Sequence, residues 1–294
     1  MNFDRSLDVP AGVEVRLSPL VSRILAPNPS AFTFKGTGTY ILGAGADAMV
    51  VDPGPDIPSH VAALQRALAG RRLRHILITH THRDHCPAAA PLKAWDANAR
   101  TYALAPAAPA ALGEGAADEA HDHDFVPDVM VTDGQNIAGD GFDITCVATP
   151  GHTANHMCYA LAQEKALFSG DHVMGWSTSV IAPPDGDMGQ YLASLDRLAA
   201  RDDAIFYPTH GSPIQQPRRW LHELIAHRRR REAQILDAVQ DAAAIPAIVE
   251  KLYPGIDIAL RGAAALQTGA HLDYLKARGL VVEKAGQWLR SGTG

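Results

Sequence analysis

The sequence is poor in cysteine and has no long apolar run. Cys86, Cys146 and Cys158 are its only cysteines and form no Cys-x-x-Cys pair. This odd number argues against a disulfide framework and fits a reducing compartment, so we expect a cytoplasmic protein. No apolar stretch approaches the roughly 18 residues that a membrane-crossing helix needs. The first residues also lack the basic and apolar regions of a secretory signal.

Aromatic and charged residues are also sparse, at 6% and 20% of the 294 residues, whereas 47% are hydrophobic. This composition is that of a soluble globular protein and excludes disordered, collagen-like and coiled-coil chains. The net charge of −6 argues against a surface coated in basic patches. Only the segment beyond residue 225 is mildly basic. We therefore expect a large domain, 1–225, and a small one, 226–294.

The large domain alternates short β-like runs with helical patterns, separated by glycine and proline. Ala48–Val51 and Ile76–Ile78 are apolar runs typical of buried strands, whereas Ser59–Leu68 has apolar residues at helical spacing. Residues 103–117 are rich in alanine and proline, which predicts a loop with some helix. The interleaving predicts an α/β fold built from packed layers.

The small domain has a different pattern. One long helix is predicted over Leu221–Val239, and shorter ones over Ala243–Leu252, Ile258–Leu266 and Thr268–Arg278. Two β-like runs joined by a turn at 285–286 follow. Helices followed by a small hairpin resemble a winged helix.

The segment from Thr79 to His85 contains the strongest chemical signal. His80, His82, Asp84 and His85 lie within six residues, directly after an apolar β run. Alternation along an extended chain places His80 and His82 on one side, so Asp84 and His85 can face a second point. Imidazole and carboxylate groups suit Zn²⁺, with manganese or iron as alternatives. The segment therefore predicts a metal site.

Three further residues of metal-ligand type follow predicted strands. His152, Asp171 and His210 each lie next to a glycine in a turn. Loops held by a rigid sheet are the usual place for such a site. Each residue alone would more often be an incidental turn residue, but together with the histidine cluster they predict one site.

These residues, together with Asp52, resemble the motifs of the metallo-β-lactamase-fold hydrolases over Val13 to His210. The resemblance implies a four-layer αββα sandwich and two divalent metal ions. It assigns His80, His82 and His152 to one ion, assigns Asp84, His85 and His210 to the other, and makes Asp171 bridge both.

Two details qualify this resemblance. Pro87 stands where the family often has glycine. Asp171 stands where exported zinc β-lactamases commonly have cysteine, which disfavours hydrolysis of lactam antibiotics. We do not expect Cys86 to be a ligand, because neighbouring residues supply enough donors.

The implied mechanism uses a hydroxide. Two cations a few ångströms apart can hold a water between them and lower its pKa towards neutrality. The hydroxide would attack a phosphorus or a carbonyl carbon. Asp84 is the expected catalytic residue because it could orient the water or receive its proton. Asp52 is expected to orient a ligand.

The chain also resembles the beta-lactamase-like protein 2 group, through Asn28–Ser30, Gly36–Tyr40 and the helix at 227–236. This resemblance implies a metal-dependent endoribonuclease or phosphodiesterase acting on single-stranded RNA. A glyoxalase II-type thioesterase, or another hydrolase of small-molecule esters, is the main alternative. A ligand-sensing regulator that binds nucleic acid is an alternative of another class. The oligomeric state, a homo-oligomer included, stays open.

Three other features have simpler interpretations. The sequence His121 to Asp124 is expected to form a solvated acidic loop. Arg228–Arg231 is expected to be a solvated helix face, with contacts to phosphate as the alternative. His172 is expected to pack beside Asp171.

Overall fold

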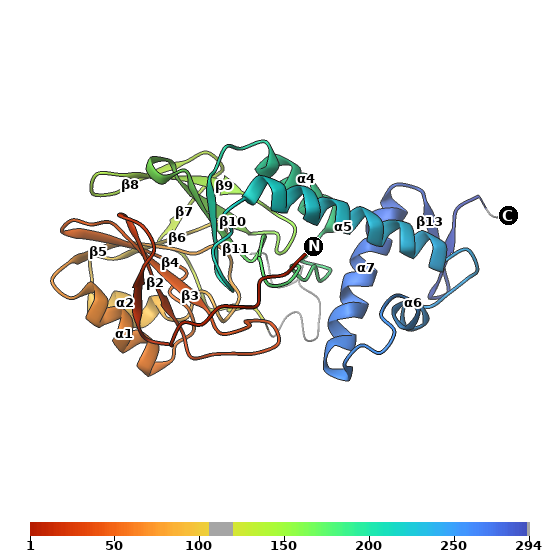
Figure 1. The fold of residues 1–294 in the computed structure, drawn as a ribbon, viewed down its shortest axis with the longest axis horizontal. Coiled ribbons are helices and arrows are strands. Elements are labelled where there is room, and N and C mark those ends of the chain that lie inside the picture. The colour runs from red at the N-terminus through yellow and green to blue at the C-terminus, as the bar shows by residue number, and fades with distance from the viewer. Residues whose placement is uncertain (106–119, 293–294) are drawn as a thin grey trace.

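The computed structural model describes residues 1–105 and 120–292, so most of the alanine- and proline-rich stretch lies outside the described residues. Within them, two sheets face each other and helices cover both outer faces (Figure 1). The first sheet contains, in spatial order, β1 (Glu14–Arg16), β2 (Val21–Leu25), β3 (Gly38–Leu42), β4 (Asp47–Val51), β5 (Arg72–Leu77), β6 (Arg100–Ala103) and β7 (Val129–Met130). The second contains β12 (Ile205–Pro208), β11 (Ala166–Gly170), β10 (Met157–Leu161), β9 (Asp143–Ala148) and β8 (Asn136–Ala138).

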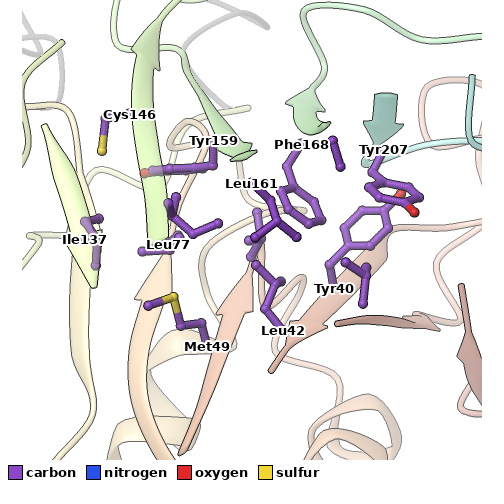
Figure 2. Packing of buried hydrophobic residues seen from close by; sticks show 14 of the residues in the cluster. Tyr40, Leu42, Met49, Leu77, Ile137, Cys146, Tyr159, Leu161, Phe168 and Tyr207 are labelled. Carbon is purple, nitrogen blue, oxygen red and sulfur yellow. The ribbon is translucent and has the colours of Figure 1, made fainter. Parts of the chain in front are cut away.

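The main core lies between the sheets. Figure 2 shows Tyr40, Leu42 and Met49 of the first sheet opposite Leu161 and Phe168 of the second. Successive side chains point to opposite faces of a sheet, so Ile41, which lies between Tyr40 and Leu42, faces the outer helices instead. Each fully buried side chain of this size contributes about 1.5–3 kcal/mol to folding.

Helices close the two outer faces of the sandwich. On the first sheet lie α1 (Pro58–Leu68) and α2 (Ala89–Trp95), and on the second lie α4 (Met188–Ala199) and α5 (Pro217–Ala238). Local sequence sets these ends: Pro58 occupies the first turn of α1, and the Asp187 carboxylate caps α4 by accepting the Gln190 N–H at 2.7 Å. The predicted four-layer αββα sandwich is thereby confirmed.

The C-terminal segment forms a small helical unit with a hairpin. It contains α6 (Ile245–Leu252), the short 3₁₀ helix η3 (Ile258–Leu260), α7 (Arg261–Ala277), β13 (Val281–Lys284) and β14 (Gln287–Arg290). Ala285 and Gly286 have φ angles of 51° and 76°, which suits a tight two-residue hairpin turn. The predicted winged-helix-like architecture is confirmed.

Two predicted helices proved to be one. The expectation of separate helices over Ile258–Leu266 and Thr268–Arg278 was wrong, because α7 runs without a break from Arg261 to Ala277 and only Ile258–Leu260 form the separate η3. Burial of Leu272 and Leu275 against Ile235 of α5 stabilises this continuous helix despite its glycines. The division at 225/226 falls inside α5, which packs on the second sheet at one end and on α7 at the other. That boundary stays a prediction.

The arginines of α5 do not form one solvated face. Arg228 is only 2% exposed, whereas Arg229 and Arg230 are exposed. The Arg231 guanidinium lies 4.2 Å above the ring of Tyr253. Both interpretations of the arginine run are therefore wrong for Arg228, because the helix face that carries it packs inward.

Among the described residues, none of the helices is long and apolar enough to cross a bilayer.

Candidate metal centre

Strand direction brings the predicted ligands to one edge of the sandwich. β4 and β5 pair in parallel, so Asp52 and His80 follow neighbouring strands at the same end. β11 and β12 also pair in parallel, which places Asp171 and His210 together. β9 and β11 are both antiparallel to β10 and so run the same way, which adds His152. Carboxyl ends of strands are the common position for binding sites in α/β folds.

All seven predicted donor residues converge there. They form three overlapping groups whose donor atoms lie within 4.8 Å of one another: His80, His82 and His152; His80, His85 and Asp171; Asp84, His85 and His210.

The two closest donor pairs belong to two different groups that have no residue in common. Nε2 of His80 is 2.8 Å from Nδ1 of His82. Nε2 of His210 is 3.0 Å from Oδ2 of Asp84. The cluster therefore has two centres rather than one.

Asp171 lies between the two centres. Its Oδ2 is 3.6 Å from Nε2 of His85 and 3.9 Å from Nε2 of His152, and its Oδ1 is 3.4 Å from Nε2 of His210. The preceding Gly170 has a φ of 52°, and a Cβ there would lie 2.9 Å from Thr79. Glycine therefore lets the chain turn directly after β11, which places the Asp171 carboxylate among the donor residues.

Backbone carbonyls orient two of the histidines. Nδ1 of His152 donates to the Val180 carbonyl at 2.6 Å, and Nδ1 of His210 donates to the Gly36 carbonyl at 3.1 Å. A carbonyl oxygen only accepts hydrogen bonds, so Nδ1 carries the proton in each ring. In the neutral form of each ring, the lone pair of Nε2 then faces the site, as metal binding requires.

Asp52 joins three of the loops that form the site. Its carboxylate accepts the Thr79 N–H and hydroxyl, both at 2.8 Å, and the Thr209 hydroxyl at 2.7 Å. Its Oδ2 also lies 2.9 Å from Nδ1 of His85. Asp52 thus orients the ring of His85, one of the predicted ligands. Sequence reasoning missed both threonines, although each directly precedes a donor histidine.

Burial and neighbouring charges shift the pKa values of residues in the cluster. Burial, together with the neighbouring His85 and His82, holds the pKa of His80 well below its usual value. For Asp171, burial favours the neutral form, but His210 and His85 outweigh it and hold the pKa far below normal. Burial similarly opposes the charged form of His210, yet Asp171 and Asp84 raise its pKa to about 10. Two carboxylates thus attract positive charge to the site.

The donor set fits divalent metal ions. Nε2 of His85 and Nε2 of His152 are buried without a hydrogen-bond partner among the described residues. Such unsatisfied buried atoms are costly in a folded protein. Five imidazoles and two carboxylates would satisfy these atoms by binding cations of the Zn²⁺, Mn²⁺ or Fe²⁺ type.

His121 lies beside this cluster, contrary to the expectation of a solvated loop. Its side chain is buried, and its ring centroid is 4.6 Å from that of His82. Its Nε2 is 3.4 Å from Oδ2 of Asp185, whose Oδ1 accepts the Ala154 N–H at 3.1 Å. His123 and Asp124 are exposed, as a solvated loop requires, so the prediction was wrong only for the buried His121. Nothing in the local sequence separates the two histidines.

Cys86 and His172 lie close to the cluster. Sγ of Cys86 is 3.5 Å from the His82 carbonyl, and burial strongly raises the pKa of this thiol. This opposes the thiolate form that a metal ligand needs. The His172 ring packs 4.5 Å from that of Tyr191, and burial lowers the pKa of His172 to about 3.

Known proteins show the same architecture. The family model of the metallo-beta-lactamase superfamily matches residues 33–210, and that of the beta-lactamase associated winged helix domain matches 244–288. The crystal structure of a beta-lactamase domain protein from Burkholderia ambifaria has a TM-score of 0.82 at 21% identity, covering 98% of this chain and 97% of that one. TTHA1623 in a di-iron-bound form has a TM-score of 0.52 at 25% identity, over 73% and 96%.

Two curated proteins are similar in sequence. The atrochrysone carboxyl ACP thioesterase AgnL7 of Paecilomyces divaricatus is 35% identical over 76% of this chain, which spans 66% of that protein. The beta-lactamase-like protein 2 homolog of Caenorhabditis elegans is 33% identical over 85% of this chain and 81% of its own length. The chain therefore belongs to the metallo-beta-lactamase superfamily, and it is a hydrolase with an appended winged helix domain.

Proposed function

We propose that this protein hydrolyses acyl thioesters at a dinuclear metal centre. The observation that carries the proposal is the similarity to a thioesterase over 76% of the chain. Burial of Arg228 removes one cation from the run that favoured an RNA substrate. Thioester hydrolysis was the main alternative from the sequence, and it now becomes the first candidate.

We assign the donors as the resemblance implied. His80, His82 and His152 hold one ion, Asp84, His85 and His210 hold the other, and Asp171 lies between them. Zn²⁺ is the first choice because imidazole and carboxylate donors suit it. The relative in a di-iron-bound form supports iron as the alternative. The three buried free cysteines agree with a reducing compartment, so we propose a cytoplasmic location.

Two bound ions would supply an activated water and stabilise negative charge on the carbonyl oxygen of the substrate. The protein's own contribution is to fix and protect the donors. Asp84 has a side chain that is 27% exposed, more than Asp171 at 11%, so it is the carboxylate that a substrate can approach. His85 and His210 outweigh burial and keep the pKa of Asp84 far below normal. Its carboxylate thus stays ionised and can orient a water by accepting a hydrogen bond from it.

The test is a parallel substrate screen with zinc-loaded protein. S-acyl glutathione and the acyl thioester of N-acetylcysteamine are compared with single-stranded RNA and a chromogenic phosphodiester. We expect turnover of a thioester, loss of at least 100-fold in Asp84→Ala, and parental rates in the control Asp124→Ala. Asp124 is an exposed acid outside the donor cluster. Cleavage of RNA or the phosphodiester without thioester turnover would replace this proposal.

An endoribonuclease is the second candidate. It is favoured by Arg218, Arg219, Arg229 and Arg230, which are all exposed on α5. Each phosphate contact made by such a residue contributes about 0.7 to the slope of log affinity against log salt for a single strand. If RNA is the substrate, Arg229→Gln with Arg230→Gln should lower that slope and leave hydrolysis of the small chromogenic phosphodiester unchanged.

A further inference from the structure

The backbone that orients His152 is held in turn by the C-terminal helices. Nδ1 of His152 donates to the Val180 carbonyl at 2.6 Å. Directly before Val180, the Ser179 carbonyl accepts a hydrogen bond from Nη2 of Arg228 in α5, also at 2.6 Å. Directly after it, the Ile181 N–H donates to Oε1 of Gln267 in α7 at 3.3 Å. The residues on both sides of Val180 are therefore fixed by helices outside the two sheets (Figure 1).

The same segment also holds the carboxylate between the two centres. The Ser179 hydroxyl donates to the Asp171 carbonyl at 2.5 Å and approaches the His172 carbonyl at 2.9 Å. The Tyr191 hydroxyl donates to the same His172 carbonyl at 3.0 Å. The ring of Tyr191 receives the Arg228 guanidinium at 5.0 Å from its centroid. Arg228 is therefore linked to the turn that carries Asp171 by two routes.

The burial of Arg228 needs an explanation. The side chain is only 2% exposed, and its Nε has no hydrogen-bond partner among the described residues. Gln267 is 8% exposed, and its Nε2 likewise has no such partner. Burying a cation against a carbonyl and a ring, rather than a carboxylate, costs folding free energy. A contribution to the site beside it would offset that cost.

We infer that Arg228 and Gln267 are positioning residues of the metal centre, which fix Ser179–Ile181 and, through the Val180 carbonyl, set the orientation and tautomer of His152. The C-terminal helices are thereby a structural part of the site. The inference rests on the proposed function for the identity of the bound group. The tautomer of His152, however, is a property of the metal-free chain.

The experiment uses two pairs of variants in the full-length protein. Arg228→Met and Gln267→Met remove the polar contacts at similar side-chain volume. Gln267→Glu keeps the acceptor for the Ile181 N–H and should restore parental behaviour. Arg229→Met is the matched control, because Arg229 is exposed on the same helix. Circular dichroism and thermal melting of the chelated proteins identify any variant that fails to fold. If Arg228→Met fails to fold, the comparison of Gln267→Met with Gln267→Glu tests the inference by itself.

The first readout is zinc affinity, measured by competition with a chromogenic chelator. Loss of a residue that orients a ligand typically weakens metal binding by about 10–100-fold. We expect that loss for one equivalent of zinc in both methionine variants and no change in Arg229→Met. In a His152→Ala background, Arg228→Met should have a smaller further effect than in the parent, because part of the coupling passes through His152. Additive losses, or unchanged affinity in both methionine variants, would overturn the inference.

The second readout needs no metal. Nitrogen-15 NMR of the chelated protein should show His152 protonated at Nδ1 in the parent and mixed tautomers in the methionine variants. A parent that binds no zinc would refute the proposed function, whereas the His152 tautomer would still decide this inference. A single Nδ1-protonated tautomer in every variant would refute it.

Discussion

Oδ2 of Asp52 lies 2.9 Å from Nδ1 of His85, although the two residues follow different strands. The same oxygen accepts the hydroxyls of Thr79 and Thr209. One buried carboxylate thus links the turns after β4, β5 and β12.

Replacing Asp52 with asparagine should disturb the metal centre more than the fold. The amide keeps the shape of the side chain but replaces one acceptor oxygen with a donor group, which would face three donors at Oδ2. We expect metal affinity to fall about 10–100-fold. Chelator competition measures this loss. Asp56→Asn is the control, since Asp56 is exposed, and a parental affinity in Asp52→Asn would remove Asp52 from the site.

His121→Ala should lower turnover, whereas His123→Ala should not. His121 packs on His82 and faces Asp185, which also holds the turn after His152. Loss of this contact should reduce kcat/KM about 10-fold. Steady-state kinetics on the thioester that the parent hydrolyses measures the change. Equal effects in the two variants would assign His121 no specific role.

Two equivalents of metal per chain are expected after zinc reconstitution. The donor residues fall into two outer groups that share a central carboxylate. Elemental analysis should approach two ions, and His82→Ala should lose at least one. Because bound ions stabilise the folded state, chelation should lower the melting temperature. A chain that binds nothing at micromolar free zinc would contradict the assignment.

The three thiols should be unreactive in the native protein. All are buried, and burial raises the pKa of both Cys146 and Cys158 to about 12, so almost no thiolate exists near neutral pH. A colorimetric thiol reagent should therefore label them slowly until guanidinium unfolds the chain, when all 3 should react. Cys86→Ser should keep parental metal content. Rapid labelling of the native protein would show that a thiol is accessible.

Stability should fall as the pH drops below about 6.5. Burial and nearby arginines lower the pKa of His227 to about 4, and burial with Arg228 strongly lowers that of His271. Both rings must stay neutral when folded but bind protons once unfolded, so acid favours unfolding. The resulting loss of stability is absent above pH 6.5 and grows as the pH falls towards 4.

Thermal melting of the chelated protein between pH 7.5 and pH 5 measures this effect. His271→Gln should flatten the pH dependence, whereas His222→Gln, which changes an exposed histidine, should leave it unchanged. A parental slope in His271→Gln would show that this ring does not contribute.

The sequence predicted most of the buried strands but missed others. Ala48–Val51 and Ile76–Ile78 stand out because strands buried on both faces are continuously apolar. The short strands β6, β7 and β8 do not stand out, because their few residues gain stability from pairing with neighbours rather than from their own propensity. β2 contains Arg23, whose buried guanidinium donates to the Gly211 carbonyl at 2.8 Å, a contact that local patterning cannot reveal.

What the sequence determined by itself is the chemistry of the site: seven donors of the right type, four of them within six residues and three in turns after apolar strands. Only the tertiary structure decided that Nδ1 of His82 faces the site and that Arg228 points inward. The residue types that can bind a metal are read directly from the sequence, and the extended chain at a strand end sets the spacing between their side chains. Orientation and burial instead depend on partners such as Val180 and Gln267, which approach from distant parts of the sequence and which no local pattern encodes.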